Sequence, residues 1–317
     1  MEDPTKKSII FSGSAIGATL GLFPSIFLVN RFGVRHTMTI FGMLSATSSL
    51  LFPLSVSLSF PTTLVIRILE GIAASVFFIV VTVITDTWSP TAELGTNLAV
   101  LSCFFQLSMI ICMPISGMLC GSEMGWRAVY YGFGTVTAGF FAVFWGFYRD
   151  DPKRCGWVSK RELEVIEEAK IGERTTNPTI PYVAILTDPT VIATYLSFFG
   201  ADINFLLLIL YGPTYLSKVL NFDVIGVGFA AALPYICSIL VKTACGKMSD
   251  KMVFISVKTR FCIFCGVSHV MQAICLMIMS TTDSKLIAQI AFTVAITSCG
   301  INITGNVLCL QLVKRDY

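Results

Sequence analysis

The chain has 317 residues, of which 55% are hydrophobic and 13% charged, with a mean hydropathy of +0.78 and a formal net charge of +3. This composition excludes a water-soluble globule of this length, because it cannot supply enough polar surface. The small, dispersed positive charge gives no support to a nucleic-acid-binding surface.

Nine nearly charge-free stretches of about membrane length follow one another along the chain. A helix needs roughly 20 mostly apolar residues to cross the hydrocarbon of a bilayer. The stretches are 8–30, 37–57, 62–85, 96–120, 127–148, 189–215, 224–246, 261–281 and 286–313. They are continuous rather than alternating, which favours helices over membrane strands. The sequence therefore predicts an all-α, multi-pass membrane protein with about nine transmembrane helices.

The lysines and arginines divide unevenly between the two sides of this topology. With the loop after the first span in the cytosol, fifteen of the 22 basic residues are cytosolic, five lie on the opposite side, and Arg67 and Lys242 lie within spans. Cytosolic loops of membrane proteins carry such an excess. We therefore expect an N-terminal bundle of five spans over 1–148, a cytosolic linker with a short amphipathic helix over 149–187, and a C-terminal bundle of four spans over 188–317.

The cysteines and loops give no sign of a metal site or a catalytic site. Most of the eleven cysteines lie inside apolar stretches, where cysteine behaves as a small hydrophobe. Cys262 and Cys265 form a CxxC pair without a second pair suited to zinc. No nucleophile, base and oxyanion donor occur together in the loops, so we expect neither an enzyme nor a bound cofactor.

The turn after the first span resembles the loop signature of the major facilitator superfamily, which ends D-R-x-G-R. It contains Asn30, Arg31, Gly33 and Arg35, and a weaker counterpart in the second half contains Gly246, Asp250 and Lys251. A short glycine turn lets two helices approach closely, and its cations can meet helix C-terminal ends. These seven residues are the expected cytosolic gate motif.

Five further segments resemble the anion:cation symporter branch of that superfamily, which includes carriers of glutamate, sialic acid and phosphate. They are Trp88-Ser89-Pro90 with Glu93, the run from Gly125 to Tyr131, Asp150-Asp151-Pro152 followed by Val158-Ser159 and Glu162, the run from Pro181 to Leu186, and Leu233-Pro234-Tyr235. The resemblance implies two bundles of six helices, of which the nine stretches would be helices two to ten. It also implies transport of a small anion.

Arg67 is a charged residue within the third span, where charge is costly and so points to a function. The Arg67-Ile-Leu-Glu70-Gly71 segment is similar to the R-x-x-Q-G motif of the superfamily, whose arginine contributes to anion binding or proton coupling. A guanidinium can hold a carboxylate or phosphate through two parallel hydrogen bonds. Alternatively, Glu70 on the same helix face simply neutralises Arg67. We predict Arg67 as a substrate contact and Glu70 as a coupling residue.

Polar residues within the later spans complete the predicted site. Asp202 lies near the bilayer centre and is predicted to couple ion movement, unless it pairs with Arg67 or a buried hydroxyl. Substrate contacts are predicted at Asn204, Asn302 and Asn306. The glycines beside Asn302 fit helix packing equally well.

Two other polar residues within spans receive no site role. His269 is expected in the core of its span, and Lys242 is expected to snorkel to the interface.

Three polar positions expected from the resemblance are replaced here. Ala74 stands for a glutamate, Ala201 for an arginine and Phe11 for a histidine, while Asn30 stands for the usual aspartate of the loop signature. These losses weaken any case for glutamate transport by the mechanism of the relatives.

The sequence as a whole favours a secondary active transporter that moves a small organic anion or inorganic phosphate by alternating access, coupled to a proton or sodium gradient. The alternative is a non-transporting membrane protein that keeps the fold as a partner or regulatory subunit. The transporter interpretation gives the chain two expected partners, the small anion and a lipid bilayer, which is that of the plasma membrane or of a vesicle or lysosome. The sequence leaves the oligomeric state open.

Overall fold

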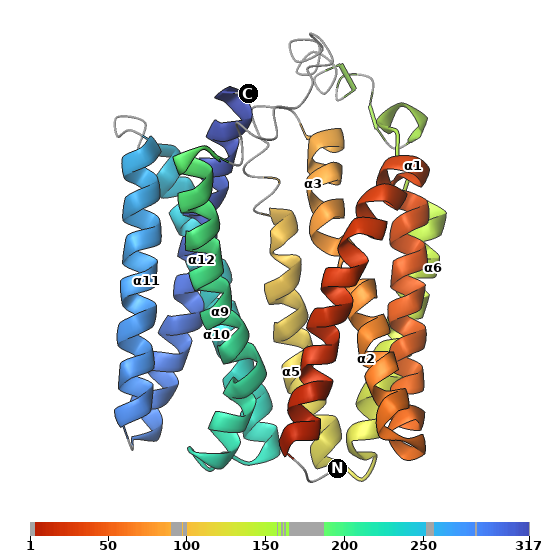
Figure 1. The fold of residues 1–317 in the computed structure, drawn as a ribbon, viewed down its shortest axis with the longest axis vertical. Coiled ribbons are helices and arrows are strands. Elements are labelled where there is room, and N and C mark those ends of the chain that lie inside the picture. Colours follow the sequence, from red (N-terminus) through yellow and green to blue (C-terminus); the bar gives the residue numbers. More distant parts are fainter. Residues whose placement is uncertain are drawn as a thin grey trace. The chain divides into compact units, whose positions relative to one another are not determined.

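A computed structural model describes residues 4–89, 97, 100–156, 158, 159, 161, 163, 164, 187–251, 257–282 and 284–316, with the side chains of 303–316 and of several residues at 246–260 outside the described set. All regular structure in these residues is helical (Figure 1). The main helices are α1 (Pro4–Leu58), α2 (Phe60–Ala74), α3 (Val76–Trp88), α5 (Phe104–Gly121), α6 (Gly125–Phe147), α9 (Pro189–Lys218), α10 (Val224–Lys251), α11 (Val257–Thr281) and α12 (Lys285–Asp316).

Eight of the described segments are long and apolar enough to cross a membrane. One of them, Ser8–Leu58, has 51 residues and covers the first two predicted spans. Gly33 interrupts it with a non-helical backbone, φ 80° and ψ 173°, so α1 consists of two arms that run in opposite directions in Figure 1. The structure therefore confirms the all-α, multi-pass architecture, with the first two predicted spans joined at Gly33.

The other span boundaries have local causes. Ser59 follows the end of α1 and caps α2, because its hydroxyl accepts a hydrogen bond from the Thr62 backbone N–H. Pro61 lies in the first turn of α2, where a backbone N–H has no partner within the helix and its absence costs nothing. Helices α2 and α3 belong to one span, Phe60–Trp88, and meet at Ser75, whose backbone stays in the right-handed helical region. In the predicted linker, Asp151 caps the short 3₁₀ helix η2 (Pro152–Arg154). Most of the predicted amphipathic helix lies outside the described residues.

The contacts between helices divide the chain into two compact units. Unit 1 contains residues 1–98 and 123–174, and unit 2 contains residues 99–122 and 175–317. Helix α5 thus groups with α9 to α12, because it packs along α10. The division into bundles at 148 and 188 stays a prediction.

In unit 1, α2 packs closely on the first arm of α1 through glycines. A Cβ atom at Gly71 would lie 2.0 Å from the Ser14 carbonyl oxygen, and one at Gly17 would lie 2.1 Å from the Ile68 carbonyl oxygen. Small residues allow this backbone approach between membrane helices, where packing replaces the hydrophobic drive. The contact holds the helix that carries Arg67.

In unit 2, an apolar core joins α9, α10, α11 and α12. Its largest buried side chains include Leu208, Leu216, Leu220, Tyr235, Phe292 and Ile296. Many other large apolar side chains are exposed, such as Phe199 at 66% and Met277 at 70%. That exposure fits a lipid surrounding, since acyl chains accept such side chains without cost.

Candidate functional site

The turn at Gly33 is held by Asp150, a residue to which the sequence assigned no role at this site. The Asp150 carboxylate accepts a hydrogen bond of 2.9 Å from the Arg35 backbone N–H, and a Cβ atom at position 33 would lie 2.7 Å from its Oδ2 atom. The Arg35 side chain donates to the Trp145 carbonyl oxygen at 2.6 and 2.9 Å and lies 4.5 Å from the centre of its ring. Nearby, burial raises the pKa of the Tyr148 hydroxyl to about 12, so it stays protonated. An acidic group therefore reaches the motif from the end of α6.

The counterpart motif in the second half has a different backbone from the one predicted. The residues from Gly246 to Lys251, including Asp250, continue α10 as helix instead of forming a short turn. Their side chains lie outside the described residues, except that of Met248. A gate role for either motif stays a prediction.

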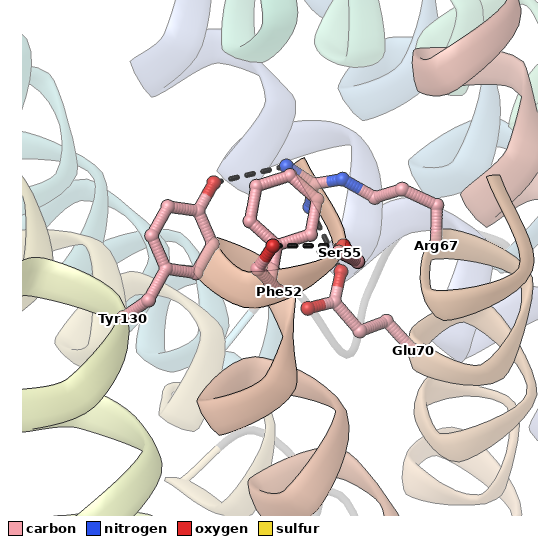
Figure 2. Close-up of polar contacts among 5 residues, drawn as sticks. All are labelled: Phe52, Ser55, Arg67, Glu70 and Tyr130. Atoms are coloured by element: carbon pink, nitrogen blue, oxygen red, sulfur yellow. Dashed lines mark hydrogen bonds and ion pairs between the residues drawn. The ribbon is translucent and has the colours of Figure 1, made fainter. Parts of the chain in front are cut away.

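Arg67 lies at the centre of a polar and aromatic cluster in unit 1 (Figure 2). Its Nη1 atom is 2.8 Å from Glu70 Oε2, and its Nη2 atom donates to the Tyr130 hydroxyl at 2.9 Å. The guanidinium carbon lies 4.1 Å from the centre of the Phe52 ring, and Phe52 stacks on Tyr130 with ring centres 4.5 Å apart. Helix α2 supplies the ion pair, the second arm of α1 supplies Phe52 and α6 supplies Tyr130.

The Arg67 guanidinium keeps donors that no described residue uses. It has five N–H groups, of which the ion pair and the tyrosine occupy two. The buried Nε atom has no hydrogen-bond partner among the described residues. The Arg67 and Glu70 side chains are 22% and 16% exposed. The neutralising pair considered for Glu70 is therefore formed, and it leaves N–H groups available for an anion.

A second polar network joins α9, α11 and α12 in unit 2. Asn204 donates to Gln272 Oε1 at 2.8 Å, and Gln272 Nε2 lies 3.1 Å from Ser268 Oγ. Asn204 is 8% exposed, and its Oδ1 atom has no partner within the described part of the chain. The predicted contact Asn204 is thus buried in a network whose other members, Gln272 and Ser268, the sequence did not single out.

His269, expected in the core of its span, is partly buried and lies next to polar groups of two other helices. Its Nε2 atom lies 3.2 Å from Ser197 Oγ and 3.3 Å from Asn302 Nδ2, so it links α11 to α9 and α12. Asn302 is 1% exposed. The Asn306 side chain lies outside the described residues, and a substrate role for either asparagine stays a prediction.

Asp202 does not join Asn204 in this network. Residues two apart on a helix point about 200° away from each other. Accordingly, Asp202 is exposed while Asn204 is buried. Its carboxylate makes no hydrogen bond or ion pair with a described residue, so the pairing with a buried hydroxyl is not seen there.

Lys242 differs from the expectation of a snorkelling side chain. It is 3% exposed, and its Nζ atom donates to Ser102 Oγ. The ammonium is therefore buried inside the unit beside Ser102, which lies just before α5, and the snorkelling prediction is wrong.

The whole chain matches a known family. A family model described as Major Facilitator Superfamily matches residues 2–317. The chain belongs to the Major Facilitator Superfamily. Solved structures share its fold. The inward-open conformation of the xylose transporter XylE from E. coli aligns with a TM-score of 0.70 at 14% sequence identity, and the alignment covers 96% of this chain and 71% of the XylE chain.

The similar sequences are the relatives that the motifs predicted. Human sialin is 27% identical over 74% of this chain and 48% of its own length. Mouse sodium-dependent phosphate transport protein 3 is 25% identical over 92% of this chain and 61% of its own length. Bovine vesicular glutamate transporter 1 is 24% identical over 99% of this chain and 57% of its own length. The chain therefore spans about half the length of the relatives it matches first. The resemblance to the anion:cation branch is confirmed, and the chain is a multi-span membrane protein homologous to transporters.

Proposed function

We propose that this protein is a secondary active transporter that moves a small organic anion or inorganic phosphate by alternating access, driven by a proton or sodium gradient. The observation that carries the proposal is the Arg67–Glu70 pair inside a membrane span, with three guanidinium N–H groups left over. A guanidinium in a membrane is stable only with a counter-charge. An anion that replaces Glu70 as that counter-charge is thereby bound.

Glu70 gives this site a way to couple anion binding to a proton. While Glu70 is ionised, it pairs with Arg67 at 2.8 Å and competes with the substrate. Protonation of Glu70 removes the negative charge, and the anion then supplies it. Deprotonation restores the pair and expels the anion, so one proton and one anion move together. The names of two relatives, a phosphate transport protein and a glutamate transporter, support an anion as the substrate class.

Asp202 is the second coupling residue in this proposal. Its exposed carboxylate on the α9 span has no described partner and is open to a proton or a sodium ion. We expect an Asp202→Asn variant to lose part of its dependence on the driving gradient. Full ion dependence in that variant would remove Asp202 from the mechanism.

Reconstitution into liposomes tests the function. Uptake of phosphate, glutamate, sialic acid and urate is measured with and without an imposed sodium or proton gradient. Gradient-driven accumulation of at least one anion is expected. Correctly inserted protein that accumulates none of them contradicts the proposal.

The second candidate function is a non-transporting membrane protein that serves as a partner or regulatory subunit. The replacements at Ala74, Ala201 and Phe11 favour it, because each removes a polar group expected from the resemblance. Such a protein would keep the helix packing at Gly17 and Gly71 but would show no uptake in the same assay.

A further inference from the structure

Lys242 is a buried charge whose counter-ion is missing from the described residues. It is the one charged side chain in the described set that counts as buried, at 3% exposure, and it lies within the membrane span Val224–Cys245. An ammonium has three N–H donors. The described contacts give it one neutral acceptor, the Ser102 hydroxyl, and no carboxylate within ion-pair distance. A buried ammonium without a negative partner is costly, so this site calls for an anion.

The seam between α5 and α10 surrounds the ammonium with further polar groups. The two helices run antiparallel, because Gly117 packs on Gly228 while Ser102, just before α5, bonds to Lys242 at the other end of the seam. Gln106 lies four residues after Ser102, and Ser238 lies four residues before Lys242. This register puts positions 106 and 238 at the same level of the seam, one helical turn from positions 102 and 242.

Gln106 and Ser238 are buried polar side chains, 4% and 2% exposed. The Gln106 Oε1 atom, a hydrogen-bond acceptor, has no partner among the described residues. A buried acceptor without a hydrogen bond is unusual in a packed seam. A protonated oxyanion such as hydrogen phosphate meets both requirements, because its charge compensates the ammonium and its O–H group can donate to Gln106 Oε1.

Gly300 on α12 leaves room next to these groups. A Cβ atom there would lie 3.0 Å from Ser238 Oγ and 3.5 Å from Lys242 Cβ. Any larger residue at this position would crowd the hydroxyl and the base of the lysine side chain. Three helices of unit 2 therefore converge on one small polar site.

We propose that Lys242, with the hydroxyls of Ser102 and Ser238 and the carboxamide of Gln106, binds a small oxyanion in the seam between α5 and α10. The ammonium supplies the charge. The hydroxyls and the amide supply donors that come from different directions, which suits several oxygen atoms better than a single halide centre. The oxyanion is either the transported substrate or an inorganic ion that stays bound. This inference goes beyond the proposed function, because binding at Lys242 is measurable without transport.

The thermal stability of the purified protein in detergent tests the site. The unfolding midpoint is measured in sodium phosphate, sodium acetate and sodium chloride at equal ionic strength and pH. All variants carry Arg67→Gln, which removes the anion contact proposed above, and they add either Lys242→Gln or, as a matched control, Lys218→Gln, which removes the same charge from an exposed position at the end of α9. We expect phosphate or acetate to raise the midpoint relative to chloride in the Arg67→Gln background and in the Lys218 variant. In the Lys242 variant this response should weaken at least tenfold in apparent affinity.

Three results would overturn the site. They are an Arg67→Gln protein that does not distinguish either oxyanion from chloride, a Lys242→Gln variant that responds as that background does, and a Lys218→Gln control that loses the response as the Lys242 variant does. Because Lys242→Gln removes an unpaired buried charge, we expect it to fold, and its midpoint in chloride shows whether it does. If that variant does not fold, Lys242→Arg must keep the response and Gln106→Ala must weaken it.

Phosphate uptake by the wild type and by the single variants Lys242→Gln and Lys218→Gln, with Arg67 intact, separates the two sources of the oxyanion. A KM at least tenfold higher in Lys242→Gln identifies the transported anion, whereas an unchanged KM identifies a resident ion. Absence of uptake in every variant, together with an intact oxyanion response, would reject the proposed transport and retain the site.

Discussion

Replacing Glu70 with Gln tests the coupling mechanism in a single step. Glutamine has nearly the shape of a protonated glutamic acid, and its amide oxygen still accepts a hydrogen bond from Arg67. The substitution therefore removes the negative charge without opening a cavity. It imitates the state in which, according to the proposal, Arg67 is released to bind the anion.

The ion pair sets the size of the expected effect. Two charges about 4 Å apart at an effective dielectric constant near 20 attract each other by about 4 kcal/mol. The Arg67 and Glu70 side chains are 22% and 16% exposed, so solvent screens part of this attraction. The hydrogen bond that glutamine retains returns about 1 kcal/mol. We therefore expect the variant to lose about 1–3 kcal/mol of folding stability when no anion is bound. The free energy of anion binding should become more favourable by an amount in the same range.

Binding and uptake measurements check both halves of this expectation. Anion affinity, measured by stabilisation of the purified protein, should rise about tenfold, since about 1.4 kcal/mol corresponds to a factor of ten. Uptake in proteoliposomes should no longer follow a proton gradient. The matched control is Glu123→Gln, which removes an exposed carboxylate of the same unit and should change neither property. Unchanged anion affinity together with full proton dependence in Glu70→Gln would refute the coupling mechanism.

Two further substitutions test the packing around Arg67. Tyr130→Phe keeps the ring stacked on Phe52 but removes the 2.9 Å hydrogen bond to Arg67. We therefore expect the variant to lose about 1 kcal/mol of folding stability and to bind the anion more weakly. A variant with wild-type stability and anion affinity would show that the hydroxyl has no role. Gly71→Ala places a Cβ atom 2.0 Å from a backbone oxygen of α1, so we expect a cost of about 1–3 kcal/mol and poor recovery of folded protein by size-exclusion chromatography. Gly139→Ala, where no atom lies within 4 Å, is the neutral control, and equal behaviour of the two alanine variants would contradict the close helix contact.

Local sequence patterns predict the spans, the turn and the ion pair. Continuous apolar runs define the helices because the bilayer requires every backbone group to be satisfied within its own segment. Gly33 marks the turn because its positive φ suits glycine. Arg67 and Glu70 meet because residues three apart share a helix face.

The remaining contacts join segments that are far apart along the chain. Asp150 reaches the backbone of Arg35, 115 residues earlier, and Tyr130 reaches Arg67 across 63 residues. Lys242 bonds to Ser102 across 140 residues. Hydropathy and spacing describe one helix at a time, so they report which residues are polar within a span but not which helix faces them. For Lys242, proximity to a helix end suggested snorkelling, whereas the packing of α5 on α10 determines its burial.

The most direct test of the account is anion uptake by the Arg67→Lys variant in proteoliposomes. Lysine keeps the positive charge but loses the planar, multiple donors that hold Glu70, Tyr130 and the anion together. The account predicts gradient-driven uptake by the wild type and background uptake by the variant, at equal amounts of inserted protein. Wild-type uptake by Arg67→Lys would contradict the central claim that this guanidinium binds the transported anion.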